Sequence, residues 1–173
     1  MKINNAIFRA YDIRGIYGKD LNEDVAEAIG KAFATYINGG EVVVGYDCRL
    51  SSESLRDALV RGLTSAGCDV LDIGMVPTPV LYFTIFHYKK DGGIMITGSH
   101  NPPEYNGFKL CKGTHTLYGE EIQELKRLIE HGKFSKGHGN VRKINVIQEY
   151  IDYVKSKVSI KRPMKIVIDS GNG

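Results

Sequence analysis

The sequence predicts an α/β fold in which helices flank a mixed, mostly parallel sheet. Short, continuous apolar segments of strand type alternate along the chain with longer segments in which apolar residues recur every three or four positions, as in amphipathic helices. Glycine and proline residues separate the two kinds of segment. The chain has 173 residues, of which 42% are apolar and 25% charged. It is therefore long enough to bury a core without disulfides.

Five segments are predicted as helices, because their apolar residues share one face and capping residues mark their ends. The first has Asn22 or Asp20 as its candidate cap, and Ser51 or Ser52 can cap the second. Pro79 is well placed to open the third, since its missing N–H is not needed in a first turn. The predicted helices span residues 21–37, 51 or 52 to 66, 80–88, 119–129 and 146–158.

Five apolar segments bounded by turn residues are predicted as strands. They span residues 41–47, 68–74, 92–97, 107–113 and 165–169. Helices separate the first three strands from one another, which favours a parallel arrangement. The fourth strand follows the third after a short loop, so we expect one local antiparallel hairpin in the sheet.

The composition changes between residues 131 and 143, where glycine and lysine occur without periodicity, as in a linker. We therefore expect a first domain over residues 1–140. Residues 141–173 then contain one helix and one strand that runs into a Gly-Asn-Gly turn at 171–173, as at the start of a second α/β domain. On this interpretation the chain is a piece of a longer protein.

Charge and cysteine usage narrow the class of function. The net charge is only +3 and the basic residues are scattered, so we expect no nucleic-acid partner. The N-terminal segment lacks a long apolar run, so neither a signal peptide nor a membrane anchor is indicated. Cys48, Cys68 and Cys111 are odd in number and lack C-x-x-C spacing, which favours reduced thiols in the cytoplasm over a disulfide framework or a zinc site.

The segment "ITGSHNPPEYNGFK", residues 96–109, is the strongest candidate for a functional loop. Ser99 directly follows a predicted strand, and ligands of α/β sheets bind beyond the carboxyl ends of strands. Pro102 and Pro103 would stiffen the loop and present the hydroxyl rigidly. A simpler interpretation is that Ser99 and Asn101 only form turns, as these residue types commonly do. Residue types alone leave both interpretations open.

Three other residues bear on the chemistry of this loop. His100 neighbours Ser99 and is suited to hydrogen-bonding a bound oxygen. Lys109 lies on the returning strand, where it could approach Ser99 and act as a general base if neighbouring cations or burial lowered its pKa. Arg14 is a candidate for such a cation and for a phosphate-binding fork. Lys109 could equally be an ordinary surface residue of a strand.

Two further observations limit the alternatives. The sequence has no G-x-S-x-G elbow, and no buried carboxylate partner can be identified for a Ser-His-Asp triad, so a serine hydrolase is disfavoured. Asp47 and Arg49 in "GYDCRLSS" are interpreted as a structural ion pair that organises the start of the second helix.

Four segments, in order along the chain, resemble the α-D-phosphohexomutase superfamily. They are "FRAYDIRG" (8–15), "VVVGYDCRLSS" (42–52), "GIMITGSHNPPEYNGFK" (93–109) and "VIDSGNG" (167–173). Within the superfamily they are most similar to the phosphomannomutase/phosphoglucomutase group. Phosphoglucosamine mutases usually open with a "GTDGIRG"-like segment, from which "FRAYDIRG" departs, and they are the alternative within the family.

The resemblance implies an enzyme of four domains around a deep cleft, of which this chain matches the first domain and the start of the second. Ser99 matches the serine that carries a phosphoryl group. Such enzymes interconvert hexose 1-phosphates and hexose 6-phosphates through a hexose 1,6-bisphosphate, which is both intermediate and activator. Mg²⁺ binds an oxygen of the phosphoserine, so Ser99 is the expected metal contact. The remaining ligands belong to an aspartate-rich loop that would follow Gly173.

The resemblance also assigns roles around Ser99. His100 and Asn101 match residues that line the phosphoserine, and Asn101 also belongs to the substrate-binding set. Lys109 and Arg14 match basic groups that take part in proton transfer, charge stabilisation and substrate binding, and Tyr11 matches a residue of the cleft. We expect phosphosugars and the remaining domains of the parent chain as partners. A stand-alone, non-catalytic phosphosugar-binding or regulatory domain is the alternative of a different class.

Overall fold

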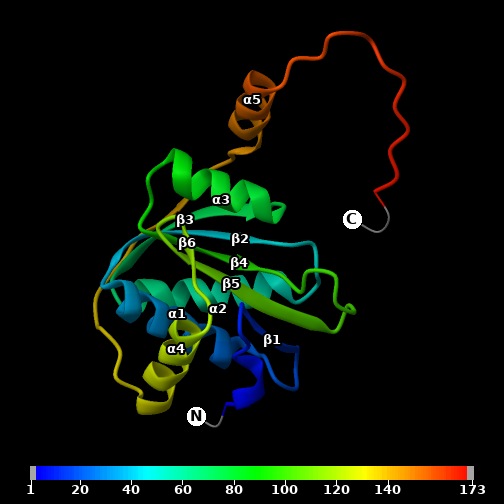
Figure 1. Ribbon diagram of the computed structural model, residues 1–173. Coiled ribbons are helices and arrows are strands. Elements are labelled where there is room, and N and C mark those ends of the chain that lie inside the picture. Colours follow the sequence, from blue (N-terminus) through cyan, green and yellow to red (C-terminus); the bar gives the residue numbers. More distant parts are fainter. Residues whose placement is uncertain (1–2, 171–173) are drawn as a thin grey trace.

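The computed structural model describes residues 3–170, in which a mixed sheet lies between two layers of helices (Figure 1). The strand order across the sheet is β1-β5-β4-β2-β3-β7, and β6 pairs with β5. The elements follow one another as η1 (Asn5–Ile7), β1 (Ile13–Ile16), α1 (Glu23–Ile37), β2 (Gly40–Tyr46), α2 (Ser52–Ser65), β3 (Cys68–Met75), α3 (Thr78–His87), β4 (Gly92–Ile96), β5 (Tyr105–Lys112), β6 (His115–Thr116), α4 (Glu120–His131), β7 (Val141–Lys143) and α5 (Ile147–Lys157).

The centre of the sheet is parallel and one side of it is antiparallel. Strand β2 runs parallel to both β3 and β4, and β7 adds to β3 in the same direction. Strand β5 returns antiparallel to β4 and then pairs antiparallel with β1. The predicted α/β class and the local hairpin are therefore confirmed. The connection of this hairpin, residues 97–104, lies within the candidate loop.

Helices α1, α2 and α4 cover one face of the sheet, and α3 covers the other, with α5 packed beyond it (Figure 1). The apolar stripe predicted for α1 is buried, including Ile29 and Phe33. Helices α1 and α2 meet at two glycines. A Cβ built on Gly62 would lie 2.1 Å from the Glu27 carbonyl oxygen, and one on Gly30 would lie 2.4 Å from the Leu59 oxygen. The two backbones therefore touch where the helices cross.

The caps of the first two helices differ in their chemistry. Asn22 caps α1, since its side chain accepts a hydrogen bond from the backbone N–H of Val25 at 3.0 Å. Ser51 occupies the corresponding position of α2 but makes no capping bond. Its hydroxyl instead accepts a hydrogen bond from the side-chain amide of the buried Asn106 at 2.8 Å. The second helix is thus anchored to β5, the strand that leaves the candidate loop.

The sequence did not predict β1, β6 or β7. Strand β7 forms at the end of the segment that was interpreted as a linker, and it pairs with β3. The strand predicted at 165–169 was wrong: residues 165–169 are exposed and form no strand. A strand needs a neighbour to satisfy its backbone groups, and this segment lies apart from the sheet (Figure 1). The predicted turn at 171–173 lies outside the described residues.

Helix α5 contacts the rest of the structure through aromatic side chains of α3. The ring of Phe83 lies 5.3 Å from that of Tyr150 and 5.2 Å from that of Tyr153, measured between centroids. Val146, just before the helix, is fully buried in the core on this side of the sheet. The boundary between a first and a second domain near residue 140 remains a prediction. Among residues 3–170, no helix has both the length and the apolarity that crossing a bilayer requires.

Candidate functional site

Two neighbouring hollows lie near the carboxyl ends of the parallel strands, one of about 370 Å³ and one of about 830 Å³. The larger hollow, called the groove, lies at the ends of β2, β3 and β4 and contains part of the candidate loop. The three strands are parallel, so their ends meet at one edge of the sheet. Residues from all three ends line the larger groove, of 830 Å³: Asp47, Cys48, Arg49, Leu50, Val76, Pro77, Thr78, Met95, Thr97, Ser99, His100, Asn101 and Pro103.

Ser99 is exposed and has a left-handed backbone conformation, with φ of 55°. That conformation costs a residue with a side chain about 1–2 kcal/mol and persists only where neighbouring contacts hold it. One such contact is the hydrogen bond from the Ser99 N–H to the hydroxyl of Thr97, at 2.8 Å. The Ser99 hydroxyl lies 3.3 Å from Nδ1 of His100. The loop therefore presents the hydroxyl to solvent beside an imidazole.

A chain of charged and polar groups connects β1 and β5 to this loop. Nη1 of Arg14 donates to Oδ1 of Asn101 at 2.6 Å, and Nη2 forms an ion pair with Asp12. Nζ of Lys109 lies 3.4 Å from the same Asp12 oxygen. The Asp12 residue is only 7% exposed, so its carboxylate is a shared internal partner of the two cations. Nε of Arg14 is buried and, within residues 3–170, has no hydrogen-bond partner.

The structure therefore brings together some of the predicted site residues more closely than others. Ser99, His100 and Asn101 line the groove, and Arg14 contacts Asn101. The sequence indicated that Lys109 could approach Ser99, and in the structure its Nζ contacts Asp12. Tyr11 lies at the surface, 74% exposed.

Two residues that contact the candidate site were missed or underestimated from the sequence. Asp12 was not singled out, because nothing in its local pattern shows that Arg14 and Lys109 both reach it. Arg49 was interpreted as part of an ion pair with Asp47, and that pair is present at 3.2 Å. Its guanidinium also donates to the backbone of the candidate loop around Ser99 (residues 96–109, the serine loop), about fifty positions further along the chain.

The acidic groups near the loop do not form a complete metal site on their own. Residues 3–170 contain no cluster of three or more His, Cys, Asp or Glu side chains that could hold a metal ion. Asp47 is the carboxylate in the groove, and it already accepts hydrogen bonds from the Ser52 hydroxyl at 2.5 Å and the Gly98 N–H at 3.2 Å. A divalent ion at Ser99 would therefore need further ligands from outside the described residues.

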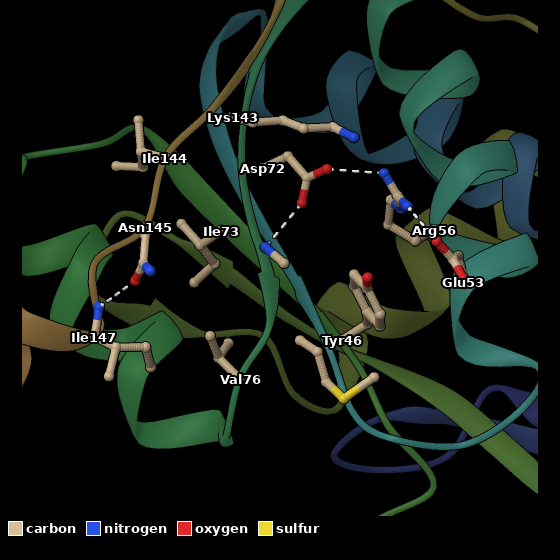
Figure 2. A pocket seen from close by; sticks show the side chains of 12 residues that line it. Tyr46, Glu53, Arg56, Asp72, Ile73, Val76, Lys143, Ile144, Asn145 and Ile147 are labelled. Atoms are coloured by element: carbon tan, nitrogen blue, oxygen red, sulfur yellow. Dashed lines mark hydrogen bonds and ion pairs between the residues drawn. The ribbon is translucent and has the colours of Figure 1, made fainter.

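The smaller hollow, of 370 Å³, lies beside the end of β3 and the segment that leads to α5 (Figure 2). Most of its polar side chains contact one another, although Nε of Arg56 is buried and has no hydrogen-bond partner among residues 3–170. Asp72 accepts from Nη1 of Arg56 at 2.8 Å and from the Gly74 N–H at 2.9 Å, and Nη2 of Arg56 lies 3.3 Å from Glu53. These pairs stabilise the end of β3 against α2. The larger groove is the better candidate site because Ser99, His100 and Asn101 line it.

All three cysteines are free thiols, as predicted. Cys48 is exposed and lines the groove, whereas Cys68 and Cys111 are buried. Burial, together with the nearby carboxylates of Asp91 and Asp69, raises the pKa of the Cys68 thiol to about 11. Burial likewise raises the pKa of Cys111. The exposed thiol beside the candidate loop is thus the accessible one.

The comparisons with known proteins agree with the geometry of the site. The family profile described as phosphoglucomutase/phosphomannomutase, alpha/beta/alpha domain I, matches residues 5–136. The chain is 46% identical to the phosphomannomutase of Escherichia coli over 175 residues, which cover 96% of this chain and 38% of that protein. It is 44% identical to the phosphomannomutase/phosphoglucomutase of Pseudomonas aeruginosa, over 97% of this chain and 37% of that protein.

A solved structure supports the same relationship. The chain matches the crystal structure of a phosphoglucomutase/phosphomannomutase family protein from Burkholderia thailandensis with a TM-score of 0.95 and 43% identity. The match covers 99% of this chain and 40% of that one. The chain therefore spans about two fifths of the length of the relatives that it matches.

Proposed function

Because the chain belongs to the phosphoglucomutase/phosphomannomutase family, we propose that it forms the N-terminal part of a phosphohexomutase. The parent enzyme would interconvert hexose 1-phosphates and hexose 6-phosphates of mannose and glucose, with a hexose 1,6-bisphosphate as intermediate and activator. The relatives' names, phosphomannomutase and phosphoglucomutase, support this substrate class over phosphoglucosamine. A cytoplasmic location fits three reduced thiols.

Ser99 carries the phosphoryl group in this proposal. A hexose monophosphate binds beside the phosphoserine. The bond between phosphorus and the serine oxygen breaks as a bond between phosphorus and the sugar hydroxyl oxygen forms, and the hydroxyl proton passes to a base. The bisphosphate then turns around, its other phosphoryl group returns to Ser99, and the proton is given back. Phosphoryl transfer depends mainly on positioning and on neutralising the charge of the transferring group.

The surrounding residues suit those two tasks. Lys109 and Arg14 would supply positive charge to the phosphoryl group, with Lys109 handling the proton. His100 and Asn101 would hold the phosphoryl oxygens, and Tyr11 would line the cleft. The contact between Arg14 and Asn101 supports this assignment, because it already links a cation to the tip of the serine loop.

Mg²⁺ is proposed to bind an oxygen of the phosphoserine and to neutralise its charge, which is close to two negative units near neutral pH. Of the described residues, Ser99 is the proposed contact, and the other ligands would come from the second domain of the parent enzyme. The 173-residue chain alone is therefore expected to lack mutase turnover. Conversion of glucose 1-phosphate to glucose 6-phosphate by the purified chain would contradict this expectation.

One observation carries the proposal: an exposed serine hydroxyl at a strand end, held in a left-handed turn inside a groove. The test is to incubate the full-length protein with glucose 1,6-bisphosphate and measure its intact mass. We expect the gain of one phosphoryl group, located at Ser99 by peptide mapping. The Ser99→Ala variant should fold, gain no mass and lose mutase activity. Substantial activity in that variant, or phosphorylation at another residue, would overturn the proposal.

A further inference from the structure

The side chain of Arg49 is buried against the serine loop and uses every donor it has. It is 13% exposed, and a guanidinium has five N–H donors in a fixed plane. Nη1 donates to the carbonyl oxygens of Pro102 and Tyr105 at 2.6 and 2.9 Å. Nη2 donates to those of Ser99 and Asn101 at 3.1 and 2.6 Å.

The fifth donor binds the carboxylate next to it. Nε of Arg49 donates to Oδ2 of Asp47 at 3.2 Å, and the Arg49 backbone N–H donates to Oδ1 at 3.1 Å. The same Oδ2 accepts the Gly98 N–H, also at 3.2 Å. Asp47 thus fixes the direction of the guanidinium and the position of Gly98 together. With all its donors satisfied by the protein, Arg49 has none left for a phosphate.

The backbone of the loop lies directly on the guanidinium. A Cβ built on Gly98 would lie 2.4 Å from Cζ of Arg49 and 2.5 Å from its Nε, which is closer than atoms of these types can approach. The absence of a side chain at Gly98 therefore lets the chain pass over the arginine. The close packing of Gly98 on Arg49 and the hydrogen bonds from Arg49 to the loop carbonyls therefore depend on each other.

The loop has few other internal hydrogen bonds that could define its shape. Pro102 and Pro103 have no N–H to donate. The loop's own bonds are those from the Ser99 N–H to the Thr97 hydroxyl at 2.8 Å, from the Asn101 N–H to the Gly98 oxygen and from the Tyr105 N–H to the Pro102 oxygen, the last two at 3.0 Å. Arg49 binds carbonyl groups at both ends and in the middle of the same turn. It is therefore placed to hold Ser99 in its left-handed conformation.

We propose that Arg49 is a positioning residue for phosphoryl transfer: it fixes the serine loop from beneath by binding four of its carbonyl groups, and it does not contact the phosphoryl group itself. This inference rests on the proposed function for its kinetic consequence. Its structural consequence, a loop ordered by Arg49, stands independently. A lysine cannot replace the arginine, because one ammonium group cannot span four carbonyls arranged around a plane.

The test uses the full-length protein and its Arg49→Lys variant. We expect kcat to fall by about ten- to a hundredfold, as for a small displacement of a reacting group, while KM for the hexose phosphate stays within about twofold, since no phosphate contact is lost. Hydrogen exchange of the peptide that covers residues 97–105 should become faster, and exchange of the central strands β2 and β3 should not change.

Two further variants test whether these effects come from the contact between Arg49 and the loop. Gly98→Ala keeps the arginine but forces it away from the loop, so it should reproduce the fall in kcat and the faster local exchange. Arg127→Lys is the matched control, because Arg127 lies on α4, is 43% exposed and pairs only with Glu120 and Glu124 in the described structure. It should behave as the wild type in both measurements.

Each contrary result has a definite meaning. A raised KM with unchanged kcat in Arg49→Lys would make Arg49 a phosphate ligand and overturn the inference. Unchanged kinetics and unchanged loop exchange would also overturn it, as would faster exchange throughout the domain in both Arg49→Lys and Gly98→Ala. If the wild-type protein is not phosphorylated at Ser99, the proposed function fails, whereas the exchange of residues 97–105 still decides whether Arg49 orders the loop.

Discussion

Arg14 and Asn101, 87 positions apart in the sequence, are joined by a hydrogen bond of 2.6 Å from the guanidinium to the side-chain amide oxygen. The same guanidinium forms an ion pair with Asp12. Strand β1 thereby contacts the tip of the serine loop, and a cation from one edge of the sheet holds Asn101, which lines the groove at the ends of the central strands. Arg14 contacts Asn101 and Asp12 at the same time, which requires a planar group with separate donors.

Replacing Arg14 by lysine should therefore impair catalysis although the charge is retained. A lysine cannot contact Asn101 and Asp12 at once in this geometry, so we expect kcat/KM of the full-length protein to fall by about tenfold or more. Arg61→Lys is a suitable control, since Arg61 is 58% exposed on α2. Steady-state kinetics that match the wild type in Arg14→Lys would show that the charge alone suffices.

Lys109→Ala should slow phosphoryl transfer more than it weakens substrate binding. The proposed role is in the transition state, so we expect kcat to fall by about a hundredfold with a much smaller change in KM. Lys112→Ala is a matched control on the same strand, because Lys112 is exposed and its Nζ lies over the Tyr36 ring, 5.1 Å from the centroid. Equal effects of Lys109→Ala on both constants would point to simple phosphate anchoring.

Gly62→Ala should destabilise the fold even though alanine is the better helix former. Alanine gains about 1 kcal/mol over glycine within a helix, whereas forcing an extra methyl group into a packed contact costs about 1–3 kcal/mol. With the Glu27 oxygen 2.1 Å from the new Cβ, we expect the packing penalty to win, and urea unfolding should show a net loss. Arg61→Lys, on the same helix, should change the free energy of unfolding by less than about 0.5 kcal/mol, because Arg61 is 58% exposed. A stabilised Gly62→Ala protein would mean that the helices can separate freely.

Alkylation should distinguish the three thiols. The thiolate is the reactive form, and the pKa of Cys68 is raised to about 11 by burial and by neighbouring carboxylates, so only about one thiol in a thousand is ionised there at pH 8. Iodoacetamide should modify Cys48 first, and peptide mapping would locate the modification. Cys68 should react only as the pH approaches 11 or after unfolding. Labelling of Cys68 as fast as Cys48 near neutral pH would show that this part of the core opens readily.

The helices and central strands could be predicted because their patterns are long and regular. The structure places α1 and α2 within one or two residues of the predicted ends. Strand β1 has only four residues and β7 only three, so neither has enough alternation to be recognised. The strand predicted at 165–169 has an apolar pattern, but a strand forms only against a neighbour, and the described residues offer it none in the sheet.

The site was predictable to the extent that its chemistry is local. Ser99, His100 and Asn101 adjoin one another in an unusual loop, and the sequence points to them directly. Asp12 and Arg49 become significant only through contacts with residues far along the chain, such as Asp12 with Lys109. A local sequence pattern reveals which chemical groups are present. The fold alone determines which distant carbonyl group or cation each of them contacts.

The pairing of β7 with β3 has a practical consequence for where a shortened version of the protein should end. A product that stops at Asn140 would leave β3 with an open backbone edge, available to pair with another molecule and so prone to aggregation. It would also remove Val146, which is fully buried. A soluble, isolated version of this domain should therefore extend past Val146, and α5 would give it a charged end.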